Sequence, residues 1–218
     1  MTIQTLTNFS NFSKTRKLLQ DGNLIEKILL FEPREEIAEL FRQMCVSNLH
    51  IDGSFENNIY GSDTHRLKLS SHQAMNFILR VLWTRLNNEA SGFRLDEPLL
   101  TIFALLWDEY NRSLLSQTNL VLALVKSLIY AKEVGDVHSF SLALNSLKII
   151  SQTSICTTTT SGFSVRFRNQ LNAYRYSIEK IIDNVRALSW WTDVESKCVE
   201  VTQTVSQCDM LVHDTKNM

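Results

Sequence analysis

The scarcity of glycine and proline limits what this chain can fold into more than any other feature. Its 218 residues include 6 glycines and 2 prolines, whereas the two residues together average about 12% of a typical protein. All-β folds use glycine and proline in their many turns. A chain with so few of them predicts long helices joined by polar connections. Hydrophobic residues make up 44% of the chain and charged residues 21%, which is enough apolar surface for a substantial core. The expected fold class is therefore all-α, a bundle of roughly eight helices.

Composition and apolar periodicity divide the chain into four expected parts. Residues 1–13 are rich in Ser, Thr and Asn and are expected to form a flexible N-terminus. Residues 14–69 should contain a helical pair followed by a long loop, and residues 70–152 a central bundle. Residues 163–213 are expected to form two long C-terminal helices whose apolar residues recur every three or four positions.

Local signals mark the ends of the central helices. Asp96 is expected to cap a helix whose residues 99–107 have almost no polar face, so that this helix should be buried on nearly all sides. Gly135 is expected to end the next helix in the left-handed conformation, and Asp136 to cap the one after it. Such short connections favour antiparallel packing of consecutive helices. The expected core includes Leu106, Leu124 and Leu147.

A narrow apolar seam runs along the last expected helix, which Thr192 and Glu195 should open as a capping box. Steps of four and three residues separate its apolar positions, which are Val194, Cys198, Val201, Val205, Cys208 and Val212. This spacing is the geometry by which one helix pairs with another, whereas a surface helix on its own domain usually has a wider stripe. We therefore expect an intermolecular contact, and packing on the chain's own bundle is the alternative. Trp190 and Trp191, just before the seam, are a second candidate docking point.

Three arginines and several aromatic residues alternate at the start of the C-terminal pair. Arginine can contact phosphates while aromatic rings stack on exposed bases, so this segment is a candidate nucleic-acid contact. The simpler alternative is a helix that buries its aromatic face and exposes its arginines. The candidate contact residues, including a short basic cluster near the N-terminus, are Lys14, Arg16, Lys17, Arg166, Arg168 and Arg175.

The sequence contains no recognisable motif for catalysis or for binding a metal or a cofactor. Its five histidines are scattered, and its four cysteines form no CxxC pair. The cysteines are expected to be reduced and mostly buried. We expect an intracellular protein without a membrane span, because we find no signal peptide and no uncharged apolar run of 18 residues.

These observations favour a non-enzymatic function. The expected protein is a helical adaptor, scaffold or assembly subunit that contacts another protein chain or a second copy of itself. The alternative is an RNA- or DNA-binding helical protein. The net charge of −1 gives this alternative no support from the overall electric field.

Overall fold

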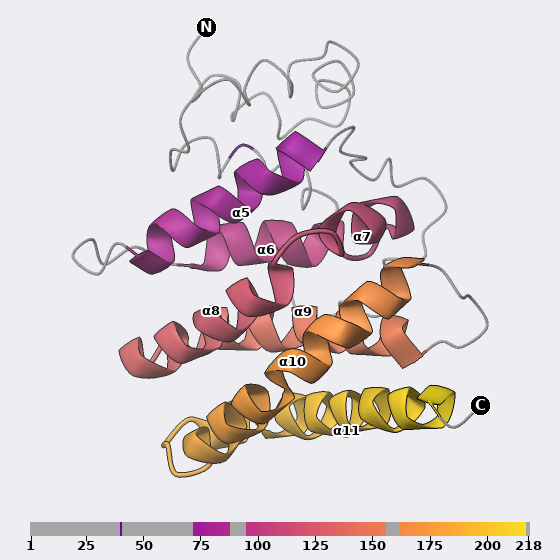
Figure 1. Cartoon of the computed structure of the whole chain (residues 1–218). Helices are drawn as coiled ribbons and strands as arrows, with labels where there is room; N and C mark the ends of the chain where they lie inside the picture. The colour runs from indigo at the N-terminus through magenta and orange to yellow at the C-terminus, as the bar shows by residue number, and fades with distance from the viewer. Residues whose placement is uncertain (1–39, 41–71, 88–94, 156–161, 217–218) are drawn as a thin grey trace, which may run out of the picture.

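The computed structural model describes residues 40, 72–87, 95–155 and 162–216, and this part of the chain is all-helical (Figure 1). Of the described residues, 88% are helical and none is in a strand, which confirms the expected all-α class but leaves the expected number of roughly eight helices a prediction. The helical pair and loop expected within residues 14–69 lie outside the described residues. The helices are α5 (His72–Asn87), α6 (Asp96–Leu105), α7 (Glu109–Leu115), α8 (Leu120–Val134), α9 (Val137–Ile155), α10 (Gly162–Val185) and α11 (Trp191–Lys216).

The chain forms two helices, α6 and α7, between Asp96 and Leu115, where the sequence analysis expects only the helix that contains residues 99–107. Asp96 is the first residue of α6, and the residue before it, Leu95, makes no side-chain capping bond. The expected Asp96 cap is therefore wrong. The sequence analysis also missed α7, whose cap is Asp108: the carboxylate Oδ1 of Asp108 accepts a 3.0 Å hydrogen bond from the backbone N–H of Asn111. In the usual N-cap arrangement, the side chain of the residue just before a helix accepts a hydrogen bond from the backbone N–H of the second or third helical residue.

The hairpin between α8 and α9 forms as its sequence predicts. Gly135 adopts φ 72°, the left-handed conformation that ends α8 and that a residue with a Cβ rarely adopts. Asp136 caps α9, because its two carboxylate oxygens accept hydrogen bonds from the backbone N–H and the hydroxyl of Ser139 at 3.0 and 2.6 Å. Gly135 and Asp136 thus form the whole connection between α8 and α9.

Helix α9 lies at the centre of the described fold and packs against α6, α8, α10 and α11 (Figure 1). Two of the buried serines on α9 satisfy their hydroxyls within the helix. Ser146 donates to the carbonyl of Leu142 at 2.9 Å, and Ser154 donates to that of Ile150 at 2.8 Å. The predicted core residues Leu106, Leu124 and Leu147 are all fully buried.

Gln170 attaches α10 to the turn between α7 and α8. Its amide nitrogen Nε2 donates to the carbonyls of Ser116 and Thr118 at 3.0 and 2.9 Å, and its oxygen Oε1 accepts from the backbone N–H of Val121 at 3.4 Å. Helix ends leave such backbone groups without partners inside the helix. One side chain thus satisfies groups at the end of α7 and at the start of α8.

Both C-terminal helices begin earlier than the sequence analysis predicts. The recurring apolar residues from Leu171 onward predict a start of α10 near Asn169. The helix instead starts at Gly162, because the fully buried Phe167 continues its apolar stripe toward the N-terminus. Helix α11 starts at Trp191, so Thr192 lies inside the helix. The capping box predicted at Thr192 is therefore wrong.

Candidate interaction surface on α10 and α11

The apolar seam of α11 faces the interior of the chain. The exposed fraction is 0% for its first five residues, which pack in the core beside α9 and α10. The side chain of Val212 is not among those that the structure describes. Of the two roles that the sequence leaves open for the seam, this placement supports packing on the chain's own bundle. The residues concerned are Val194, Cys198, Val201, Val205 and Cys208.

Polar contacts beside the seam join α11 to α9. Lys148 Nζ lies 2.6 Å from Glu200 Oε2, and the hydroxyl of Ser151 donates to the hydroxyl of Thr204 at 2.7 Å. The thiol of Cys208 lies 3.7 Å from the carbonyl oxygen of Ser151. Because both residue numbers rise together along these contacts, the two helices run parallel, and the side of α11 that carries Glu200 and Thr204 faces α9.

The two tryptophans before the seam are both partly buried and have different neighbours. The Trp190 ring packs edge-on against the ring of the buried Phe140, with 5.2 Å between ring centroids and 65° between ring planes. The guanidinium carbon of Arg186 lies 5.9 Å from the centroid of the Trp191 ring, a cation–π arrangement. Trp190 therefore packs against the core, while Trp191 lies beside the exposed Arg186 at the α10–α11 turn.

The arginines of the α10 segment do not form one basic surface. Arg168 Nη2 donates to the backbone carbonyl of Ser154 in the last turn of α9 at 2.7 Å. Arg175 Nε lies 2.8 Å from Glu179 Oε1, one helical turn further along. Arg166 is exposed. The candidate contacts Lys14, Arg16 and Lys17 lie outside the described residues.

The aromatic residues of the same segment divide in a similar way. Phe167 is fully buried, and Phe163 and Tyr174 are partly buried against the core. Tyr176 alone among these four is exposed, at 76%. Of these four rings, only that of Tyr176 is therefore free to stack on a nucleic-acid base. Single-strand binding sites instead stack successive bases on several exposed rings.

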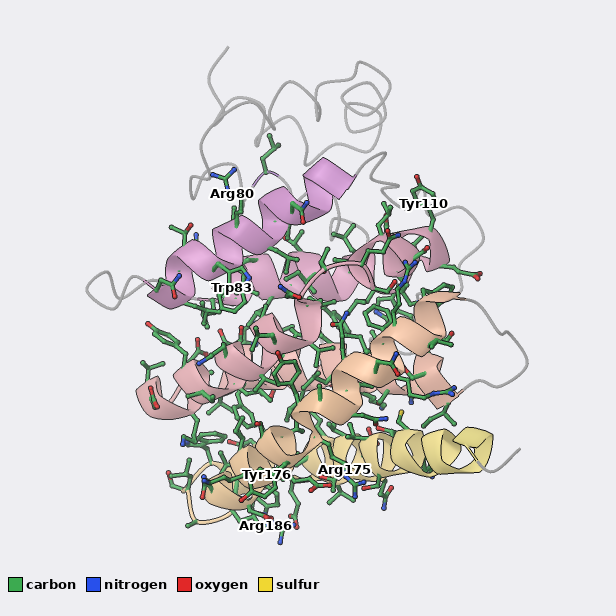
Figure 2. The ribbon with its side chains drawn as sticks, in the orientation of Figure 1. Arg80, Trp83, Tyr110, Arg175, Tyr176 and Arg186 are labelled. Carbon is green, nitrogen blue, oxygen red and sulfur yellow. The ribbon has the colours of Figure 1, made fainter. Side chains whose placement is uncertain are left out.

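Helix α10 presents a second, outward stripe that the sequence analysis did not identify. Its members recur every three or four residues and are all exposed: Arg166, Asn169, Ala173, Tyr176, Lys180 and Asp183. Figure 2 shows Arg175, Tyr176 and Arg186 on α10 and the turn after it, along the lower edge of the view. A mostly polar stripe at this spacing that points away from the core is the solvent-facing side of the helix.

Two exposed apolar side chains lie on the outward side of α10. Among the described residues, five large hydrophobic side chains are exposed, and those on α10 are Val165 (47%) and Tyr176 (76%). They are about three helical turns apart and point to the same side, because successive residues turn by about 100° around a helix. We define the outer face as the exposed side of α10 that carries Val165, Tyr176 and Lys180.

Some charged side chains of α10 and α11 take part in described ion pairs and others do not. Arg175 is paired with Glu179, and Arg186 with Asp183 at 3.4 Å. Arg166 and Lys180 of α10 and Asp193 and Glu195 of α11 are exposed and form no described salt bridge.

The described cysteines are free and buried. Burial raises the pKa of the Cys198 thiol from 9.0 to about 11, against the opposing cations of Arg186 and Lys197. Burial likewise raises the pKa of Cys208 to about 11, against the cation of Arg168. A raised thiol pKa disfavours the reactive thiolate, so neither residue is poised as a nucleophile.

No known protein family, curated protein or solved structure matches the chain. In the described residues, no group of three or more His, Cys, Asp or Glu side chains is placed to hold a metal ion. No single described helix is long and apolar enough to cross a membrane; α7 and α8 together reach that length and composition but are bent by 85°.

Proposed function

We propose that this protein is a non-enzymatic helical adaptor, scaffold or assembly subunit, and that it contacts a protein partner through the outer face of α10. The observation that carries the proposal is Tyr176, which is 76% exposed in the middle of a regular outward stripe. Tyrosine is enriched at protein interfaces, where its ring supplies contact area and its hydroxyl a hydrogen bond.

The surroundings of Tyr176 support a protein partner over a nucleic acid. Val165 is a second exposed apolar side chain on the same side of α10, and apolar side chains within a polar surround are typical of protein interfaces. Of the three candidate arginines, two already bind groups of the chain itself. A nucleic-acid site would instead need several unpaired cations aligned along the phosphate backbone of the bound nucleic acid.

A photo-cross-linking amino acid in place of Tyr176 tests this proposal. The full chain would carry it at residue 176 or, as a matched control, at Val134, which is 56% exposed at the end of α8. Expression in cells and irradiation should give a discrete protein adduct from residue 176 and none from residue 134. Equal labelling at both positions, or no adduct at residue 176, would contradict the proposal.

A further inference from the structure

Helix α11 joins the rest of the described fold through one narrow apolar stripe. The helix lies at the lower edge of the described fold (Figure 1) and packs mainly against α9 and α10. Its fully buried side chains are short, three valines and two thiols: Val194, Cys198, Val201, Val205 and Cys208. The other α11 side chains that the structure describes are half-buried or exposed. The helix is therefore held along one side only.

The central helix α9 meets α11 on a different side from the one that it buries against its other neighbours. Lys148 and Ser151 make the polar contacts with α11. Leu142 and Ser146 are buried on the opposite side of α9, because successive residues turn by about 100° around a helix. Helices α6, α8 and α10 also pack against α9. The core that α9 forms with these helices would therefore remain covered if α11 moved away.

Helix α11 is poorly suited to remain helical without its neighbours. Of its 26 residues, five are valines and four are threonines, and these β-branched residues are weak helix formers. It is the last described helix, and the turn 186–190 joins it to α10, so no other described helix must move with it. Because tertiary packing supplies most of the stability of such a helix, α11 should lose its helical structure and its contacts together.

We propose that α11 is released from α9 and α10 as one cooperative unit while α5 to α10 keep their packing. Opening one part of a fold costs less free energy than unfolding all of it. The release exposes the seam, whose four-three spacing is the geometry by which helices pair. The seam is thus a contact surface that the folded chain keeps closed. This inference is independent of the outer face of α10, so its failure leaves the proposed function standing.

Labelling of the two seam thiols in the full chain measures this release. Cys45→Ser and Cys156→Ser, combined with either Cys198→Ala or Cys208→Ala, leave one seam thiol in each variant. Dithiobis(nitrobenzoic acid) forms a mixed disulfide with an accessible thiolate and releases thionitrobenzoate, which is followed by its absorbance across a urea series. Both thiols should react at least about tenfold faster than global unfolding allows, with one shared opening free energy. The dependence on urea should be weaker than for global unfolding, because release of one helix exposes less surface.

The matched control places a single thiol in the core away from α11. Ala123 is fully buried on α8, so Ala123→Cys in a chain without its own four cysteines should react only through global unfolding. Circular dichroism of each variant shows that it is folded, and its own urea curve gives its global free energy of unfolding. Seam thiols that react only at the rate and urea dependence of global unfolding overturn the release. A reactive Cys208 beside a protected Cys198 also overturns it, because the helix then only frays at its end.

Discussion

The hydroxyl of Ser151 donates a 2.7 Å hydrogen bond to the hydroxyl of Thr204 and thereby joins the central helix α9 to α11. Ser151 is fully buried, and the ion pair between Lys148 and Glu200 lies one turn away. These contacts fix the face of α11 that meets α9. The apolar seam of α11 is consequently part of the core, and its residues are not available on the surface for a partner.

Replacing Val201 by Asp should unfold or strongly destabilise the protein. Val201 is fully buried beside α9, and an unpaired charge there would cost several kcal/mol. Gln203→Asp is the matched control, because Gln203 is exposed on the same helix, and it should change the free energy of unfolding by less than about 0.5 kcal/mol. Urea unfolding followed by circular dichroism measures both. A folded Val201→Asp protein with the parent's stability would contradict the placement of the seam.

The sequence predicts those features of the fold that depend on residues close together in the chain, and it does not predict those that depend on packing between distant segments. Gly135 and Asp136 determine a turn through their own backbone and side-chain chemistry, so the α8–α9 hairpin could be predicted. The spacing of Val194 to Cys208 predicts a seam equally well but cannot say which helix covers it. That depends on the long-range packing of α9 against α11. The outer face was missed for the same reason: Tyr176 is exposed only because Phe167 and Ile178 determine which side of α10 is buried.

Gln170→Ala should destabilise the fold although Gln170 is only partly buried. The substitution leaves the carbonyls of Ser116 and Thr118 and the N–H of Val121 without the bonds that the glutamine makes. Because these partly buried backbone groups would lose their hydrogen bonds, the free energy of unfolding should fall by about 1–3 kcal/mol. Asn169→Ala, an exposed neighbour, is the control in the same denaturant titration. Equal stability of the two variants would show that the Gln170 contacts are energetically unimportant.

Charge reversal at Arg168 and at Arg166 should have different consequences. Arg168→Glu removes the hydrogen bond to the Ser154 carbonyl and places a negative charge at the negative end of the α9 dipole, so the melting temperature should fall. Arg166→Glu alters an exposed side chain and should leave the melting temperature within about 2 °C of the parent's. Gel retardation of oligonucleotides at low salt, measured on the same proteins, tests the nucleic-acid alternative. Retardation of the parent that Arg166→Glu weakens would favour that alternative.

The buried thiols should make stability fall at alkaline pH. The pKa values of Cys198 and Cys208 are raised from 9.0 to about 11 in the folded chain, so the unfolded chain loses its thiol protons first. Their contribution to stability is therefore fully present below pH 9 and is lost as the pH rises from 9 to about 11. Urea titrations across this range should show a shallower decline for the double variant Cys198→Ala/Cys208→Ala. An identical decline in the parent would show that other groups cause the effect.

The mass in solution of the Tyr176→Asp variant, measured beside its thermal melt, tests the central claim most directly. Tyr176 is 76% exposed, so its replacement should leave the melting temperature of the monomeric fold nearly unchanged. If the outer face binds a second copy, light scattering should give a dimer for the parent and a mass near 25.1 kDa, that of one chain, for the variant. A folded variant that keeps the parent's dimeric mass would contradict the assignment of the outer face as the interaction surface.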